Sequence, residues 1–104
     1  MTDFVKIGQK KDFKDLAATN VTVGEKSICV ARSGDIFYAF DDRCTHAQVM
    51  LSRGDLEQDE IVCPLHGARF SIKTGEALTP PAVRPVQTYD VKIQGDDVFV
   101  ALAS

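Results

Sequence analysis

Side chains that bind transition metals are scarce in this chain, which has two histidines and three cysteines among 104 residues. Long apolar runs are absent too: the longest, Val98 to Ala103, has six residues, whereas a helix needs about 20 to span a bilayer. The first six residues lack a basic stretch followed by an apolar one, so no secretory signal is predicted. We therefore expect a cytoplasmic protein without a membrane segment.

The chain also lacks a cluster of positive charge, although it has 12 basic residues against 15 acidic ones. The net charge is −3, and lysine and arginine form no run that would follow a phosphate backbone, so nucleic acid is not an expected partner. The chain has no G-x-G-x-x-G motif for a nucleotide, and its length suits one domain. These absences exclude a reductase that would bind its own nicotinamide or flavin cofactor.

The few metal-binding side chains are concentrated in two short segments. One reads Cys44-Thr45-His46, and the other reads Cys63-Pro64-Leu65-His66-Gly67. Sixteen residues, 47–62, separate the first histidine from the second cysteine. Each segment therefore offers one thiol and one imidazole, which indicates a metal centre built from both.

Two kinds of centre use four such ligands. Structural zinc is tetrahedral, but it commonly takes two cysteines from one knuckle and two histidines from a helix. A Rieske 2Fe-2S cluster has two cysteines on one iron and two histidines on the other. The mixed segments favour one such cluster held by Cys44, His46, Cys63 and His66, with a colourless, redox-silent zinc module as the alternative. The remaining cysteine, Cys29, is predicted to be a buried apolar residue.

Both segments, together with Leu51–Glu57 and Phe70–Ala77, resemble the Rieske-type ferredoxins of bacterial aromatic-ring-hydroxylating dioxygenase systems, over essentially the whole chain. The resemblance implies an electron carrier, not an enzyme, between a flavin reductase and a terminal oxygenase. A terminal oxygenase needs a further iron held by two histidines and a carboxylate, and both histidines are already assigned to the cluster. A small Rieske subunit of another oxidoreductase, such as a nitrite- or arsenite-metabolising enzyme, remains an alternative.

Short alternating segments separated by turn residues predict an all-β fold. Strands are expected at 21–23, 26–32, 36–40, 89–93 and 98–102, and one helical turn at 11–16. The resemblance implies a single Rieske domain over 1–104. Its antiparallel β-sandwich base would comprise about 1–41 and 84–104, with an inserted cluster-binding subdomain over about 42–83.

The resemblance also implies how the surroundings of the cluster set its potential. High-potential members have hydroxyl donors just after the second segment, where this chain has Ala68 and Phe70. They also have a disulfide between the segments, where this chain has Val49 and Leu65. Because hydrogen bonds to the sulfurs stabilise the reduced state, a potential at the low end of the Rieske range, about −150 mV, is predicted.

A small, mostly apolar rim is predicted around the two histidines, formed by Ala47, Gln48, Val49, Leu65 and Pro81. Redox encounters commonly use interfaces below about 1,200 Å², so we expect a monomer that docks transiently with its reductase and oxygenase. A run of acidic residues is interpreted as a solvated face, with steering of a basic partner as the alternative. These residues are Asp55, Glu57, Asp59 and Glu60.

Overall fold

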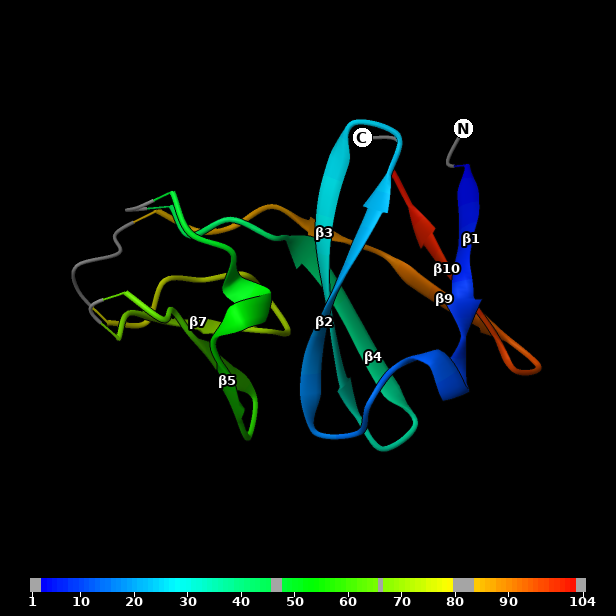
Figure 1. Cartoon of the computed structure of the whole chain (residues 1–104), viewed down its shortest axis with the longest axis horizontal. Coiled ribbons are helices and arrows are strands. Elements are labelled where there is room, and N and C mark those ends of the chain that lie inside the picture. The colour runs from blue at the N-terminus through cyan, green and yellow to red at the C-terminus, as the bar shows by residue number, and fades with distance from the viewer. Residues whose placement is uncertain (1–2, 46–47, 66, 80–83, 103–104) are drawn as a thin grey trace.

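A computed structural model describes residues 3–45, 48–65, 67–79 and 84–102. Within these ranges the chain forms ten strands in three antiparallel sheets and two single turns of 3-10 helix (Figure 1). None of the described helices has the length and apolar character of a membrane span. The predicted all-β fold is confirmed.

The first sheet has the order β1-β10-β9, formed by Phe4–Gln9, Asp97–Ala101 and Val91–Gln94. The second has the order β2-β3-β4-β8, formed by Ala17–Val23, Lys26–Ser33, Ile36–Asp41 and Thr88–Tyr89. The third has the order β5-β6-β7, formed by Asp55–Glu57, Glu60–Val62 and Arg69–Ser71. The 3-10 turns are η1, Lys10–Asp12, and η2, Leu51–Arg53.

The first two sheets pack face to face as a sandwich. Val98 and Val100 of β10 lie in one buried cluster with Ile28 and Val30 of β3. Such packing of two antiparallel sheets is expected where alternate residues of each strand are apolar. Figure 1 shows β1, β9 and β10 at one end of the molecule, while β5 and β7 lie at the other.

Strand β3 is buried on both of its faces. Because successive side chains point to opposite faces of a strand, Ile28 and Val30 face the sandwich, whereas Cys29 and Ala31 lie in a second core. The second core also contains Cys44 and Cys63. The Cys29 side chain is 0% exposed, so its prediction as a buried apolar residue is confirmed.

Local details differ from the sequence prediction in two places. The strand expected at 89–93 is divided into β8 and β9, because the chain leaves the second sheet and joins the first around Asp90. The helical turn expected at 11–16 is η1, and Leu16 instead has a positive φ of 56° before β2 begins. The third sheet lies between 42 and 83, but residue 83 is outside the described residues, so the subdomain boundaries stay a prediction.

Candidate functional site: two matched cysteine loops

The first loop begins directly after β4. The backbone N–H of Cys44 donates to the carbonyl of Val49 at 3.0 Å, which closes the loop on itself. The hydroxyl of Thr45 donates to the carbonyl of Arg84 at 2.8 Å. This bond fastens the first loop to the segment that leads back into the base.

The second loop joins β6 to β7 and is closed in the same way. The backbone N–H of Cys63 donates to the carbonyl of Ala68 at 2.7 Å, so in both loops the cysteine bonds to the fifth residue after it. Gly67 has a φ of +69°, a conformation that glycine adopts without a steric cost. A Cβ there would meet nothing within 4 Å, so conformation and not crowding accounts for this glycine.

The thiols of the two loops meet in the second core. Cys44 is 2% exposed and Cys63 is 1% exposed, and neither takes part in a disulfide with a described residue. Burial, together with a hydrogen bond with the Cys44 side chain, raises the pKa of the Cys63 thiol to about 11, against an opposing hydrogen bond with the Leu65 backbone. The hydrogen bond between the two side chains makes the sulfurs neighbours.

The residues that flank the two predicted histidine ligands in the sequence lie on the outer side of these loops. His46 and His66 are outside the described residues, but Thr45, Leu65 and Gly67, which flank them in the sequence, are exposed. The arrangement puts sulfur donors inside and the chain positions next to the imidazoles outside. Two adjacent buried thiols without a disulfide fit the cysteine half of a Rieske cluster, because cysteine binds iron as thiolate.

Two of the four positions that were compared with high-potential family members are fully buried. Ala68 and Phe70 are both 0% exposed and belong to the same core as the two thiols. Val49 packs against that core, and Leu65 is 40% exposed. The side chains at these four positions therefore bring neither a hydroxyl group nor a disulfide to the sulfur ligands.

A buried carboxylate, which the sequence analysis did not single out, supports the first loop. Asp42 is 3% exposed and lies two residues before Cys44. It accepts hydrogen bonds from the Asn20 side chain at 2.7 Å and from the Ser52 backbone N–H at 2.7 Å. These bonds join β2, η2 and the start of the first loop. An acidic pair at a strand end gives no sequence signal of this role.

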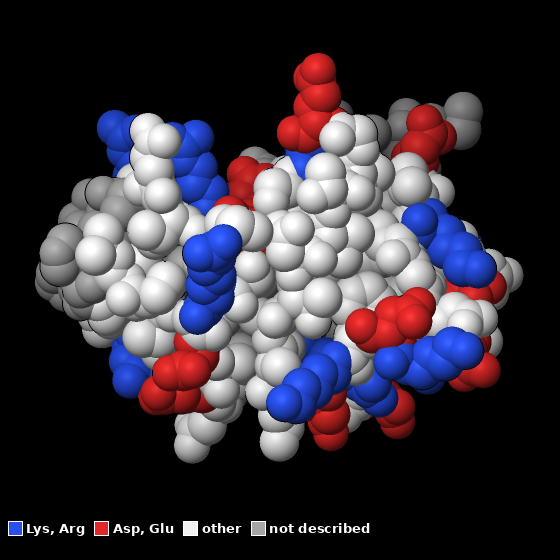
Figure 2. Space-filling model, in the orientation of Figure 1, with Lys and Arg blue, Asp and Glu red and all other residues white. Residues whose placement is uncertain are grey.

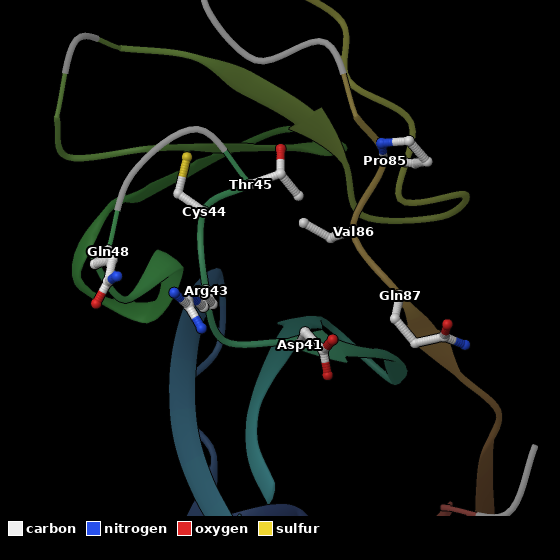
Figure 3. Close-up of a pocket in the computed structure, with 8 residues that line it drawn as sticks. All are labelled: Asp41, Arg43, Cys44, Thr45, Gln48, Pro85, Val86 and Gln87. Carbon is white, nitrogen blue, oxygen red and sulfur yellow. The ribbon is translucent and has the colours of Figure 1, made fainter.

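Two hollows adjoin the first loop on either side of Gln48. One has a volume of about 500 Å³ and is lined by Cys44 and Thr45 of the first loop and by Pro85 and Val86 (Figure 3). The other, of about 480 Å³, is lined by Gln48, Val49, Met50, Arg53, Pro64 and Leu65. Three residues of the predicted docking rim, Gln48, Val49 and Leu65, therefore come together. The other two, Ala47 and Pro81, lie outside the described residues.

Three of the four acidic residues in the run form ion pairs with two basic residues of the third sheet and the turn after it. Arg69 bonds to Glu57 at 2.9 Å and to Glu60 at 3.4 Å, and Lys73 lies 3.3 Å from Asp59. Paired surface charges attract a distant partner less than unpaired ones do. The solvated-face interpretation of this run is thus favoured over steering of a basic partner.

Comparison with known proteins agrees with this geometry. A model of the Rieske 2Fe-2S domain matches residues 3–90. The 3-phenylpropionate/cinnamic acid dioxygenase ferredoxin subunit of Escherichia coli K12 is 47% identical over 76 residues, which is 72% of each chain.

Solved structures show the same likeness over nearly the whole chain. The ferredoxin of carbazole 1,9a-dioxygenase from Nocardioides aromaticivorans IC177 is 36% identical with a TM-score of 0.89, covering 94% of this chain and 96% of that one. A chain in the complex of reduced oxygenase and oxidised ferredoxin of carbazole 1,9a-dioxygenase is 35% identical with a TM-score of 0.88. That match covers 94% of this chain and 92% of that chain.

Proposed function

Because the chain belongs to the Rieske 2Fe-2S domain family, we propose that it carries single electrons from a flavin-containing reductase to a terminal ring-hydroxylating oxygenase. Its cofactor is one Rieske-type 2Fe-2S cluster. The observation that carries the proposal is the meeting of two buried thiols at the heads of loops closed by the same hydrogen bond. A carrier needs such a rigid, shielded site and no substrate pocket.

We assign the four ligands to two ends of the site. Cys44 and Cys63 would hold the inner iron, and His46 and His66 would hold the outer iron. When bound, the cluster supplies a one-electron centre that is reduced more easily than a four-cysteine one, between about −150 and +300 mV against about −400 mV. The apolar side chains of Leu51, Ile61 and Phe70, all 0% exposed, keep water from the sulfur end.

The expected surroundings of the carrier follow from the same features. The three cysteines form no disulfide with a described residue, which fits a reducing compartment such as the cytoplasm. A related ferredoxin forms a complex with its oxygenase, which supports a terminal oxygenase as the electron acceptor here. The flavin reductase and a monomeric state complete the proposal.

The ligand assignment is tested by spectroscopy of purified protein. We expect a coloured protein whose dithionite-reduced form has the electron paramagnetic resonance of a cluster with mixed nitrogen and sulfur ligation. Cys44→Ser, Cys63→Ser, His46→Ala and His66→Ala should each lose that signal, whereas the matched control Cys29→Ala should keep it. A colourless protein with one zinc ion per chain would overturn the assignment in favour of the zinc module.

The role as carrier is tested by reconstitution. Protein mixed with a flavin-containing dioxygenase reductase and NADH should be reduced, and it should then pass its electron to a terminal oxygenase that holds an aromatic substrate. Product should form in proportion to the carrier added. Stable co-purification with a nitrite- or arsenite-metabolising enzyme, without transfer to any ring-hydroxylating oxygenase, would overturn the proposal.

A further inference from the structure

The arginines of this chain are distributed unevenly over the fold. Of five in the sequence, three are exposed and surround the first cysteine loop: Arg43, Arg53 and Arg84. Arg43 directly precedes Cys44 and lines one hollow, while Arg53 lines the other. Arg84 adjoins the loop because its carbonyl accepts the hydrogen bond of Thr45.

These three arginines keep their charge available to a partner. Among the described residues, no acidic side chain lies within ion-pair distance of Arg43, Arg53 or Arg84. The other basic residues of this part of the molecule, Arg69 and Lys73, are already paired with acidic side chains. Figure 2 shows basic side chains above and beside η2, and acidic side chains near β5.

Apolar side chains lie beside Arg53. Val49, Pro64 and Leu65 line the hollow that contains this arginine, and Leu65 is 40% exposed. We call these six residues, three arginines and three apolar side chains, the arginine face. A protein docking site commonly combines apolar groups with a polar rim, and arginine is enriched in such sites.

We propose that the arginine face recognises an acidic rim on the terminal oxygenase, around an apolar patch that receives Val49, Pro64 and Leu65. The proposal rests on the proposed function, because the oxygenase is the electron acceptor named there. The proposal gives the docking surface a positive charge, opposite to the net charge of the chain, which is −3. The local charge of the arginine face, and not the net charge, would orient the encounter, because exposed charges are screened over about 8–10 Å.

The first test uses small redox probes in place of the oxygenase. Reduced holoprotein is mixed with the anionic cobalt(III)–EDTA complex or with the cationic cobalt(III) hexaammine complex, and oxidation is followed at increasing salt. If the arginine face controls access, the rate with the anion falls as salt rises and the rate with the cation increases. The opposite pair of slopes, as the net charge alone predicts, would overturn the proposal.

Two triple variants locate the effect. Arg43→Gln, Arg53→Gln and Arg84→Gln together should lower the rate with the anion about tenfold at low salt and abolish its salt slope. Lys11→Gln, Lys14→Gln and Lys92→Gln remove the same number of positive charges from η1, the turn after it and β9, and should change the rate less than about twofold. Equal effects of both triples would overturn the proposal.

The second test uses the terminal oxygenase of a ring-hydroxylating system that accepts electrons from the wild-type carrier. Transfer to it should slow with salt, and the arginine triple should slow it at low salt while the lysine triple should not. Reduction potentials of both triples are measured so that the rates compare at equal driving force. Transfer that is insensitive to the arginine triple overturns the docking proposal alone. A wild-type carrier that reduces no oxygenase overturns the proposed function, whatever the probes show.

Discussion

The hydroxyl of Ser52 lies 2.5 Å from the buried carboxylate of Asp42 and donates a hydrogen bond to it. Together with the backbone N–H of Ser52 and the side chain of Asn20, it gives this carboxylate three donors. Ser52 belongs to η2 and Asn20 to β2, so the carboxylate joins separate elements at the base of the first loop. Its partners account for a charged group so deep in the fold.

Asp42→Asn should therefore destabilise the protein without a change in volume. An amide has one accepting oxygen, so at least one of the three donors would face an N–H group and remain unsatisfied. We expect the free energy of unfolding to fall by about 2–3 kcal/mol. Urea unfolding of the holoprotein measures this. Ser52→Ala, which removes a single donor, should cost only about 1 kcal/mol; an equal loss in both variants would contradict the account.

Gly54 is the point where η2 approaches the strand that precedes the second cysteine. A Cβ on Gly54 would lie 1.7 Å from the carbonyl oxygen of Val62, a backbone atom that cannot rotate away. Gly54→Ala should displace β6 and with it Cys63, at a cost of about 3 kcal/mol or more. Visible absorbance per mole of protein should fall because cluster incorporation suffers.

Gly24→Ala provides the matched control for this prediction. Gly24 has a φ of +60° in the turn between β2 and β3, and a Cβ there would meet nothing within 4 Å. The substitution should cost about 1–2 kcal/mol through conformation alone and leave the cluster content unchanged. Full cluster content in Gly54→Ala would show that the close approach does not position the second loop.

Tyr89 gives the fold a sensitivity to alkaline pH. Burial, together with a hydrogen bond to Asp41 at 2.5 Å, raises the pKa of Tyr89 to about 12. In the unfolded chain this pKa is about 10. The contribution of the neutral Tyr89 hydroxyl to the free energy of unfolding is thus complete below about pH 10. It is lost as the pH rises through about 12.

Tyr89→Phe should reduce this loss of stability between about pH 10 and 12, because the group that ionises is gone. The free energy of unfolding, measured in urea across this range, tests the expectation. Tyr38→Phe removes the other tyrosine hydroxyl, keeps the Tyr89–Asp41 pair and serves as the control. A decline that is as steep in Tyr89→Phe as in the wild type would refute the assignment.

A hydroxyl at position 68 should raise the reduction potential. Ala68 is 0% exposed and follows the second loop, so Ala68→Ser would place a donor near the sulfur ligands. A hydrogen bond worth about 1 kcal/mol in the reduced state corresponds to about 40 mV for one electron. Phe70→Tyr should add a similar amount. Protein-film voltammetry measures both. Ala68→Gly, which adds no donor, is the control, and a rise there of the same size would discredit the hydrogen-bond argument.

The ligand segments and the fold class could be predicted from the sequence because both depend on local patterns. Four of five histidine and cysteine residues fall in two short segments, and alternating apolar residues predict strands whatever their order in the sheets. The strand pair around Gly24 was also evident, because the turn lies between two apolar segments. Tertiary structure altered the end of the chain, where one expected strand is shared between two sheets.

The charge around the first cysteine loop was decided only by the tertiary structure. Arg43, Arg53 and Arg84 are far apart in the sequence, where they form no cluster, and the fold brings them to one loop. Meanwhile three of the four residues in the acidic run are paired with Arg69 and Lys73. Ligand chemistry is determined by residue identity, which the sequence states directly. Surface potential and the partners of Asp42 depend on distances between remote segments, which folding alone sets.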